Sequence, residues 1–276
     1  MSRLTIIIAT FAAFFLLGAC GKIDVEIADS VVVMNYSVSV ADPVAKALGD
    51  GSNVNRMAYA IYEGETCINS DVVEVIDGRC SFHPSLYYGR TYTVAMFAYW
   101  NGAYDVSDDL KNIKLDGANG RYADAFAHKE TIRIDVNGDL YIDGNKSDQS
   151  AGNRSVNLLR PVAQLALVTE SLDAMQQAGA AKIRISLKAP ETYNAVACTS
   201  GAVKTMEQTS VVENLGTVSV SDKSYTAVSC SYFFPAENQT VTIDVLKEDN
   251  TPLSTFNVSD IPLVANKKTN LIIGAL

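Results

Sequence analysis

The histidines, cysteines and acidic residues of this chain are the side chains whose spacing could support chemistry. The two histidines, His83 and His128, form neither an HExxH nor an HxH pair, the spacings that place two imidazoles on one metal ion. The sequence also contains no GxSxG, P-loop or GxGxxG pattern, the usual signs of a serine nucleophile or a bound nucleotide. We therefore expect a protein that is not an enzyme, has no catalytic residues and needs no cofactor.

One acidic stretch begins like a calcium-binding loop. Residues 135–139 carry carboxylate or amide side chains at alternate positions, but Leu140 stands where the sharp turn needs glycine, and no glutamate closes the loop. Asn137-Gly138 instead fits the two-residue turn of a twisted β-hairpin. The sequence therefore predicts a hairpin here and no metal site.

The beginning of the chain has the layout of an export signal that is cut before a cysteine. Arg3 gives a positive start, residues 4–19 carry no charge, and small residues precede Cys20. This layout resembles a bacterial lipobox, in which the cysteine thiol is acylated and the residue becomes the new N-terminus. We therefore predict a signal peptide at 1–19 and a lipid, such as palmitate, on Cys20 that attaches the protein to a membrane. The alternative is an ordinary secretory signal cut near a cysteine.

The charge of the chain excludes some partners. The 276 residues include 22 basic and 31 acidic side chains, and removal of residues 1–19 leaves 257 residues with a formal net charge of −10. Such an acidic chain is unsuited to nucleic acid or to an anionic membrane surface. No other long apolar run occurs, so the predicted lipid is the membrane attachment that the sequence indicates.

Four cysteines remain beyond Cys20, and none of them forms a CxxC pair, so zinc binding and thioredoxin-like chemistry are not expected. Four cysteines allow three pairings. Because the first two and the last two lie in different halves of an exported chain, we expect the disulfides Cys67–Cys80 and Cys198–Cys230.

Most of the remaining sequence predicts β-strands. Residues 182–188 and 240–247 alternate apolar and polar side chains, which is typical of a half-buried strand. Residues 92–100 are apolar on both faces, as in a central strand covered on both sides, and residues 31–40 form a β-branched run. One segment, 171–180, reads as a helix that Ser171 caps and Gly179 ends. The predicted fold class is all-β, in sandwiches, with one short helix.

A polar stretch at 143–154 is the best candidate for a linker. A division there gives two halves of ordinary domain size. We therefore predict an N-terminal β-sandwich domain at 20–154 and a C-terminal β-sandwich domain at 155–276.

Five stretches of the chain, in order, resemble the fimbrillin-like lipoproteins of Gram-negative anaerobes, the subunits of type V pili. The combination of Arg160-Pro-x-Ala-Gln, a short helix and a Pro190-x-x-Tyr-Asn step is the most specific part of this resemblance. The five stretches are Ala41–Tyr62, Tyr92–Asp109, Val156–Gln177, Ile183–Val203 and Ile261–Leu276.

The resemblance implies a structural or adhesive role at the cell surface. Such proteins have two tandem β-sandwich domains and reach the outer membrane as lipid-anchored precursors. In polymerising members a protease cuts a loop after the first strand, and a strand from a neighbouring subunit fills the groove that the lost strand leaves. Here the removable strand would be 31–40, the cleavable loop 41–56 and the next strand 57–63, with other fimbrial subunits as partners.

Two departures bear on this expectation. Members that mature by cleavage usually carry arginine in the loop, where this chain has Lys46, so Lys46 and Arg56 are the candidate processing sites. The chain also stops at Leu276, right after the Thr269-Asn270 segment, where polymerising relatives continue into a strand that can be donated, which favours an anchor, a tip component or a surface lipoprotein that does not polymerise.

Aromatic residues suggest an alternative function. Trp100 and Tyr104 lie at and just after the end of a predicted strand, where exposed rings could stack on sugars. The alternative is therefore a glycan-binding outer-membrane lipoprotein of a nutrient-uptake system, with a host or dietary glycan or a protein receptor as the partner. Burial of the same rings in the core would exclude a platform.

We predict that Cys20→Ser abolishes incorporation of labelled fatty acid, because the serine hydroxyl is a poor substitute for the acylated thiol. Metabolic labelling and mass spectrometry of the purified chain measure this. Cys198→Ser is the matched control and should keep the label. Label in the Cys20→Ser variant would contradict the lipobox interpretation.

Overall fold

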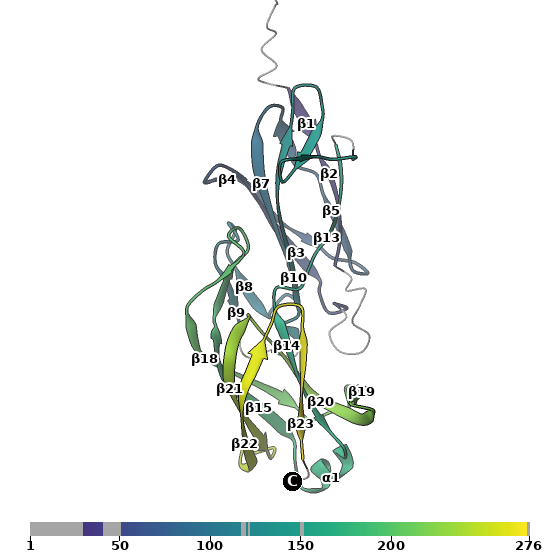
Figure 1. Ribbon diagram of the computed structural model, residues 1–276, viewed down its shortest axis with the longest axis vertical. Coiled ribbons are helices and arrows are strands. Elements are labelled where there is room, and N and C mark those ends of the chain that lie inside the picture. The colour runs from purple at the N-terminus through teal and green to yellow at the C-terminus, as the bar shows by residue number, and fades with distance from the viewer. Residues whose placement is uncertain (1–29, 41–50, 117–119, 121, 150–151, 275–276) are drawn as a thin grey trace, which may run out of the picture.

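The computed structural model describes residues 30–40, 51–116, 120, 122–149 and 152–274. Within these residues the regular structure is almost entirely β-strand, with one short α-helix, so the predicted fold class is confirmed. Figure 1 shows an elongated molecule with β1 near one end of its long axis and α1 at the other, beside the C-terminal end. In the part of the chain that the structure describes, no helix is long and apolar enough to cross a membrane.

Six antiparallel strands form the central sheet of the upper half in Figure 1. In sheet order they are β12 (Asn145–Lys146), β11 (Leu140–Ile142), β10 (Ala125–Ile134), β7 (Thr91–Tyr99), β3 (Arg56–Glu63) and β4 (Thr66–Glu74). Val94 and Met96 of β7 point into one apolar cluster, whereas Ala95 and Phe97 point into another. The prediction of a strand buried on both faces is therefore confirmed.

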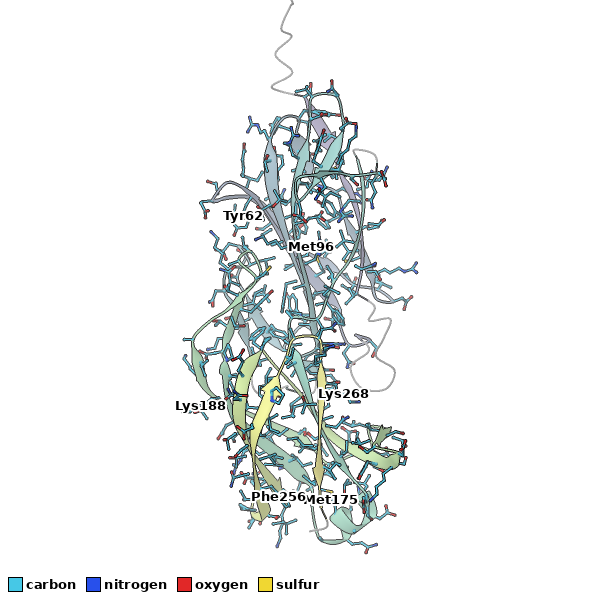
Figure 2. The ribbon with its side chains drawn as sticks, in the orientation of Figure 1. Tyr62, Met96, Met175, Lys188, Phe256 and Lys268 are labelled. Carbon is cyan, nitrogen blue, oxygen red and sulfur yellow. The ribbon has the colours of Figure 1, made fainter. Side chains whose placement is uncertain are left out.

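The first of these clusters, here the upper core, lies between the central sheet and the N-terminal sheet. The N-terminal sheet contains β13 (Asn153–Asn157), β2 (Asn35–Ser39) and β5 (Arg79–Phe82), and beside it β1 (Val31–Val33) pairs with β6 (Ser85–Tyr87). Figure 2 shows side chains filling the space between the sheets, with Met96 in the upper half. The strand predicted at 31–40 is present, with a break at Met34.

Two four-stranded sheets form a second sandwich in the lower half of Figure 1. One contains β19 (Thr217–Val220), β20 (Lys223–Phe233), β14 (Ala163–Thr169) and β23 (Lys268–Ile273). The other contains β18 (Val203–Val211), β15 (Lys182–Pro190), β21 (Ala236–Leu246) and β22 (Pro252–Leu263). Ile183, Ile185 and Leu187 of β15 are buried between the sheets, as their alternation predicts.

The one described helix, α1 (Leu172–Gln177), also follows its sequence signals. The hydroxyl of Ser171 accepts a hydrogen bond from the backbone N–H of Ala174 at 3.2 Å, which satisfies one of the free donors of the first turn. Gly179 has a φ of 88°, the left-handed conformation that ends many helices. The predicted start and end of the helix are both confirmed.

The hairpin between β10 and β11 is present, but its turn differs from the prediction. Only Gly138 of the three loop residues, 136–138, has a positive φ, of 87°, whereas a two-residue twisted turn needs two such residues. The N–H of Gly138 donates to the carbonyl of Asp135 at 3.0 Å, and the N–H of Asp135 donates to the carbonyl of Asp139 at 2.9 Å. The loop is therefore a three-residue turn with a glycine bulge.

A small four-stranded sheet, here the linking sheet, joins the two halves. In sheet order it contains β17 (Thr199–Ser200), β16 (Thr192–Asn194), β9 (Ile113–Leu115) and β8 (Tyr104–Val106). Next to this sheet, rings from both halves meet: the ring centroids of Phe97 and Tyr193 lie 6.4 Å apart, and those of Tyr104 and Phe234 lie 6.1 Å apart. A continuous cluster, the lower core, therefore runs from the central sheet into the lower sandwich.

The predicted boundary after residue 154 falls inside β13, which pairs with β2. The buried side chains change from the upper core to the lower core between Leu158 and Val162. Between these two residues, the guanidinium of Arg160 donates to both carboxylate oxygens of Asp124, at 2.6 and 2.9 Å, and both side chains are buried. The division into two domains remains a prediction.

We predict that Arg160→Leu lowers the free energy of unfolding by about 3–5 kcal/mol, because it leaves the buried carboxylate of Asp124 without its cation. The double variant Asp124→Leu/Arg160→Leu should lose much less, since no charge is left unpaired. Arg90→Leu breaks the exposed pair with Glu63 and should cost no more than about 1 kcal/mol. Denaturant unfolding measures all three, and equal losses for the single and double variants would contradict the argument.

Candidate strand-exchange site

β2 is the middle strand of the N-terminal sheet. It pairs in parallel with β13, from Asn35 beside Asn153 to Ser39 beside Asn157, and antiparallel with β5. Within the described residues, β2 is the sheet partner of both flanking strands. Loss of β2 would therefore leave the facing edges of β13 and β5 without partners.

Alternate side chains of the same segment fill the upper core. Met34, Tyr36, Val38 and Val40 are each at most 2% exposed. The ring of Tyr36 stacks on Phe82 with 4.5 Å between the centroids. Burial of one such side chain contributes about 1.5–3 kcal/mol, so the segment is held by its side chains as well as by its backbone hydrogen bonds.

The intervening side chains of β2 form the outer, polar face of the sheet. Asn35 donates to Asn153 at 3.3 Å, and its amide oxygen lies 3.0 Å from Nδ1 of His83. Ser37 lies beside Ser81 in the register. A shallow groove of about 820 Å³ crosses this face. The sequence of β2 therefore has the two-residue period of a strand that is apolar inside and polar outside.

A buried carboxylate lies across the upper core from β2. Glu130 of β10 is 1% exposed, and its Oε1 accepts a hydrogen bond from the hydroxyl of Tyr36 at 3.0 Å. The guanidinium of Arg154, on β13, donates to both carboxylate oxygens at 2.5–3.1 Å. Nε2 of His128 lies 3.1 Å from Oε2. This cluster connects β2, β10 and β13 across the sandwich.

The electrostatics of the cluster favour an ionised glutamate. Burial alone would raise the pKa of Glu130, but hydrogen bonds and charge from His128 and Arg154 outweigh burial and lower that pKa to about 2. Burial and the neighbouring charge of Glu130 raise the pKa of Tyr36 well above its ordinary value. Tyr36 is therefore a protonated hydrogen-bond donor to an ionised acceptor at neutral pH.

The candidate lipidation and processing sites are only partly covered by the structure. Cys20 and Lys46 lie outside the described residues. Arg56 is the first residue of β3, pairs with Glu74 on one side and Tyr99 on the other, and forms a 3.4 Å ion pair with Glu74. Cutting after Arg56 would therefore require β3 to open at its start.

The predicted disulfides are not formed, since all four cysteines are free thiols in the structure. Cys67 packs against the lower core and Cys80 against the upper core, so the central sheet separates them. Cys198 is exposed, whereas Cys230 is buried and accepts a hydrogen bond from Gln164 at 3.2 Å. Burial raises the pKa of Cys230 to about 11.

The predicted sugar platform is also corrected. Tyr104 is buried, and its hydroxyl donates to the backbone carbonyl of Ala123. Trp100 is half-buried and leans on Tyr122, with 4.9 Å between the ring centroids. The two residues therefore form no exposed pair, because Tyr104 packs into the lower core against Phe97 and Phe234.

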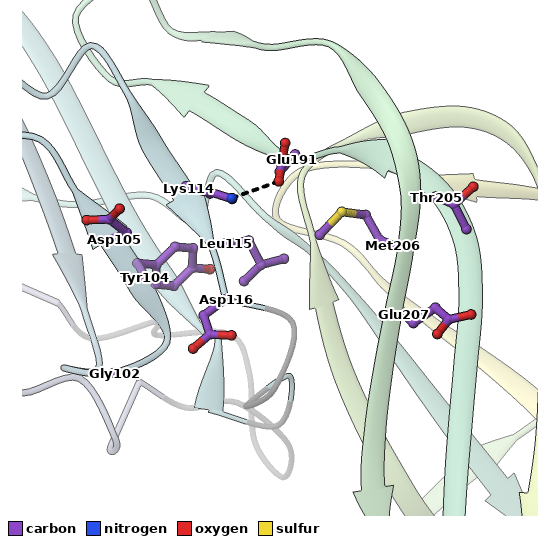
Figure 3. Close-up of a pocket in the computed structure, with 10 residues that line it drawn as sticks. All are labelled: Gly102, Tyr104, Asp105, Lys114, Leu115, Asp116, Glu191, Thr205, Met206 and Glu207. Carbon is purple, nitrogen blue, oxygen red and sulfur yellow. Dashed lines mark ion pairs between the residues drawn. The ribbon is translucent and has the colours of Figure 1, made fainter.

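Tyr104 instead lines the edge of a hollow between the two halves, shown in Figure 3. The hollow has a volume of about 530 Å³ and contains an ion pair between Lys114 of β9 and Glu191 at 3.0 Å. Its other charged lining residues are acidic: Asp105, Asp116 and Glu207. Because Lys114 and Glu191 come from different halves, this hollow is a feature of their junction.

The remaining candidates for chemistry have structural surroundings. Asp135 accepts hydrogen bonds from the N–H groups of Asn137 and Asp139, both at 2.9 Å, and so stabilises the hairpin turn. His83 and His128 contact Asn35 and Glu130, respectively. Among the described residues, no group of three or more histidine, cysteine or acidic side chains is placed to hold a metal ion.

Sequence analysis missed the cluster around Glu130. A signal was present, because Phe126, Glu130, Ile132 and Ile134 share one face of a strand, and a carboxylate on an otherwise apolar face needs a buried partner. The partner itself could not be named, since Arg154 is 24 residues away and Tyr36 is 94 residues away.

Comparison with known protein families identifies the family to which this chain belongs. Residues 29–276 match a family of unknown function, DUF6562, and the chain belongs to this family. No curated protein matches the sequence.

Several solved structures are similar over most of their length. A candidate adhesin from Bacteroides ovatus aligns over 88% of both chains, with a TM-score of 0.49 and 12% identity. A fimbrial assembly protein from Parabacteroides distasonis aligns over 88% of this chain and 91% of its own, with a TM-score of 0.47 and 9% identity. The fimbrial anchor protein Mfa2 from Porphyromonas gingivalis aligns over 88% of this chain and 91% of its own, with a TM-score of 0.43 and 10% identity.

We predict that acid weakens the protein partly through Glu130. A carboxyl whose pKa falls from 4.5 to about 2 on folding contributes roughly 3 kcal/mol above pH 4.5, and this contribution is lost as the pH falls toward 2. The stability advantage of the wild type over Glu130→Gln should therefore shrink between pH 5 and pH 2. Denaturant unfolding across this range measures it. Val38→Ala, which removes core volume but no charge, should show a constant difference, and a constant difference for Glu130→Gln would contradict the prediction.

Proposed function

We propose that this protein is a lipid-anchored, fimbrillin-like protein of the cell surface with a structural or adhesive role, as a fimbrial subunit, tip or anchor. It acts by strand complementation: a strand from a neighbouring subunit takes the place of residues 31–40. The observation that carries the proposal is the position of β2, which alone holds β13 and β5 together within the described N-terminal sheet.

The energetics favour replacement of β2 over a permanent gap. Without the segment, two strand edges and the apolar groove beneath them would face water. An incoming strand would restore the backbone hydrogen bonds and bury alternate side chains in the places of Met34, Tyr36, Val38 and Val40. The backbone supplies affinity for any extended segment, whereas the side-chain positions choose among segments.

Two other sheet edges of the molecule carry features that oppose pairing with a further strand. β22, at the edge of its sheet, carries Pro252 and Pro262 and has register shifts in its pairing with β21. β23 begins with Lys268. Proline, lysine and bulges on edge strands are common devices against unwanted strand addition. We therefore propose the exchange at the interior position of β2 rather than at these two edges.

The predicted anchor and processing sites agree with this arrangement. β1 lies near one end of the long axis in Figure 1, so a lipid on Cys20 would attach the molecule at that end and let the C-terminal half project. The segment between residues 40 and 51 joins the exchangeable strand to the central sheet, and Lys46 lies within it. A cut there would separate the strand, together with the lipid on Cys20, from the rest of the chain, so the lipid would anchor the precursor and any copy that is not cut. We propose this cut at Lys46, or after Arg56 once β3 opens at its start.

We predict that cell envelopes run on a gel without boiling give a ladder of this chain that collapses to one band on heating. Strand-exchanged polymers lose many hydrogen bonds only together, so they resist detergent until heated. The units of the ladder should lack residues 20–46 or 20–56, as peptide mapping would show. A single band of full mature length in the unboiled sample would contradict strand exchange.

A further inference from the structure

The groove that holds β2 offers a charged group as well as apolar surface. Glu130 is 1% exposed, and its Oε1 receives the hydroxyl of Tyr36 at 3.0 Å. The guanidinium of Arg154, on β13, pairs with the carboxylate of Glu130. Nε2 of His128 lies 3.1 Å from Oε2 of the same carboxylate. Because Arg154 and His128 belong to the body that would remain after removal of β2, the carboxylate would stay ionised and in place in the open groove.

Apolar complementarity alone leaves the register of an incoming strand open. Met34, Tyr36, Val38 and Val40 are all apolar and alternate, so a slip of two residues would keep apolar side chains facing the core. Such a slip would place Met34 or Val38 opposite Glu130. A buried carboxylate oxygen would then face methyl groups without its hydroxyl donor, which is unfavourable.

From this geometry we infer that Glu130 selects the strand in the β2 position: it accepts a segment that brings a tyrosine hydroxyl to the place of Tyr36 and rejects one that is apolar there. The inference rests on the proposed function, because it concerns the strand that replaces β2. The preferred partner is an extended segment of the pattern apolar-x-Tyr-x-apolar-x-apolar. Residues 34–40 of an uncleaved second copy of this chain, released from its own groove, meet this requirement.

The test uses the whole mature chain with a specific protease site at residues 44–48, cut after folding. Peptides of residues 30–40 with tyrosine or phenylalanine at position 36 then compete with a labelled tyrosine peptide for the groove that residues 31–40 occupy. The tyrosine peptide should bind roughly 10- to 100-fold more tightly, as expected for a hydrogen bond to a charged acceptor. Equal affinities would overturn the inference.

A matched variant separates selection from general stability. In Glu130→Leu/Arg154→Leu both charges become apolar, so the fold keeps no unpaired ion and the tyrosine hydroxyl has no acceptor. The preference should vanish or reverse toward the phenylalanine peptide. A tyrosine preference that persists in this variant would overturn the role of Glu130, because a purely structural role would weaken both peptides alike.

If neither peptide enters the groove, strand exchange itself is contradicted. The role of Glu130 can then still be tested by unfolding of the intact chain. Tyr36→Phe, Glu130→Gln and the double variant form a cycle in denaturant unfolding. If Glu130 selects the strand through this hydrogen bond, the two substitutions are not additive. The unfolding equilibrium constant of the double variant should then be at least about ten-fold smaller than the two single effects together predict. Simple additivity would overturn the inference independently of any exchange.

Discussion

Burial of both faces of the central sheet is the constraint on which the rest of the structure depends. β3 and β7 carry apolar side chains on both sides, so each face needs its own cover. The N-terminal sheet covers one face, and the linking sheet with the lower sandwich covers the other. The two covers differ, because one depends on β2, a single strand near the start of the described chain, whereas the other includes the whole second half. In the proposed exchange, an incoming strand would restore the first cover, whereas the second would not change.

Two buried ion pairs tie the covers to the same strand. Glu130 lies on β10 and Asp124 comes just before it, and their partners Arg154 and Arg160 lie on the segment that leaves the upper half. Between these pairs, the backbones of Ala127 and Leu159 exchange two hydrogen bonds. Desolvation offsets much of the Coulomb energy of buried pairs, whereas the loss of one partner leaves a buried group unsatisfied and is costly. In the proposed exchange the same property would distinguish one incoming strand from another.

Much of the fold could be predicted from local patterns. Alternation predicts β15, the fully apolar run predicts β7, and Ser171 with Gly179 predicts the ends of α1. These features depend on residues a few positions apart, and the burial they describe is a property of one face of one element. The candidate site was predictable to the same extent: residues 31–40 read as a strand, but its neighbours and the charge opposite it did not follow from the pattern.

The sequence by itself determined the strands, the helix caps and the sidedness of each element, because periodicity and turn chemistry are local. Tertiary structure alone decided what lies against each face. It separated Cys67 from Cys80 by a sheet, buried Tyr104 in the lower core and brought Tyr36 to Glu130 across 94 residues. The physical reason is that the chemistry of an apolar or charged side chain determines which kind of partner it needs. Which residue becomes that partner depends on the packing of strands that are distant in the sequence.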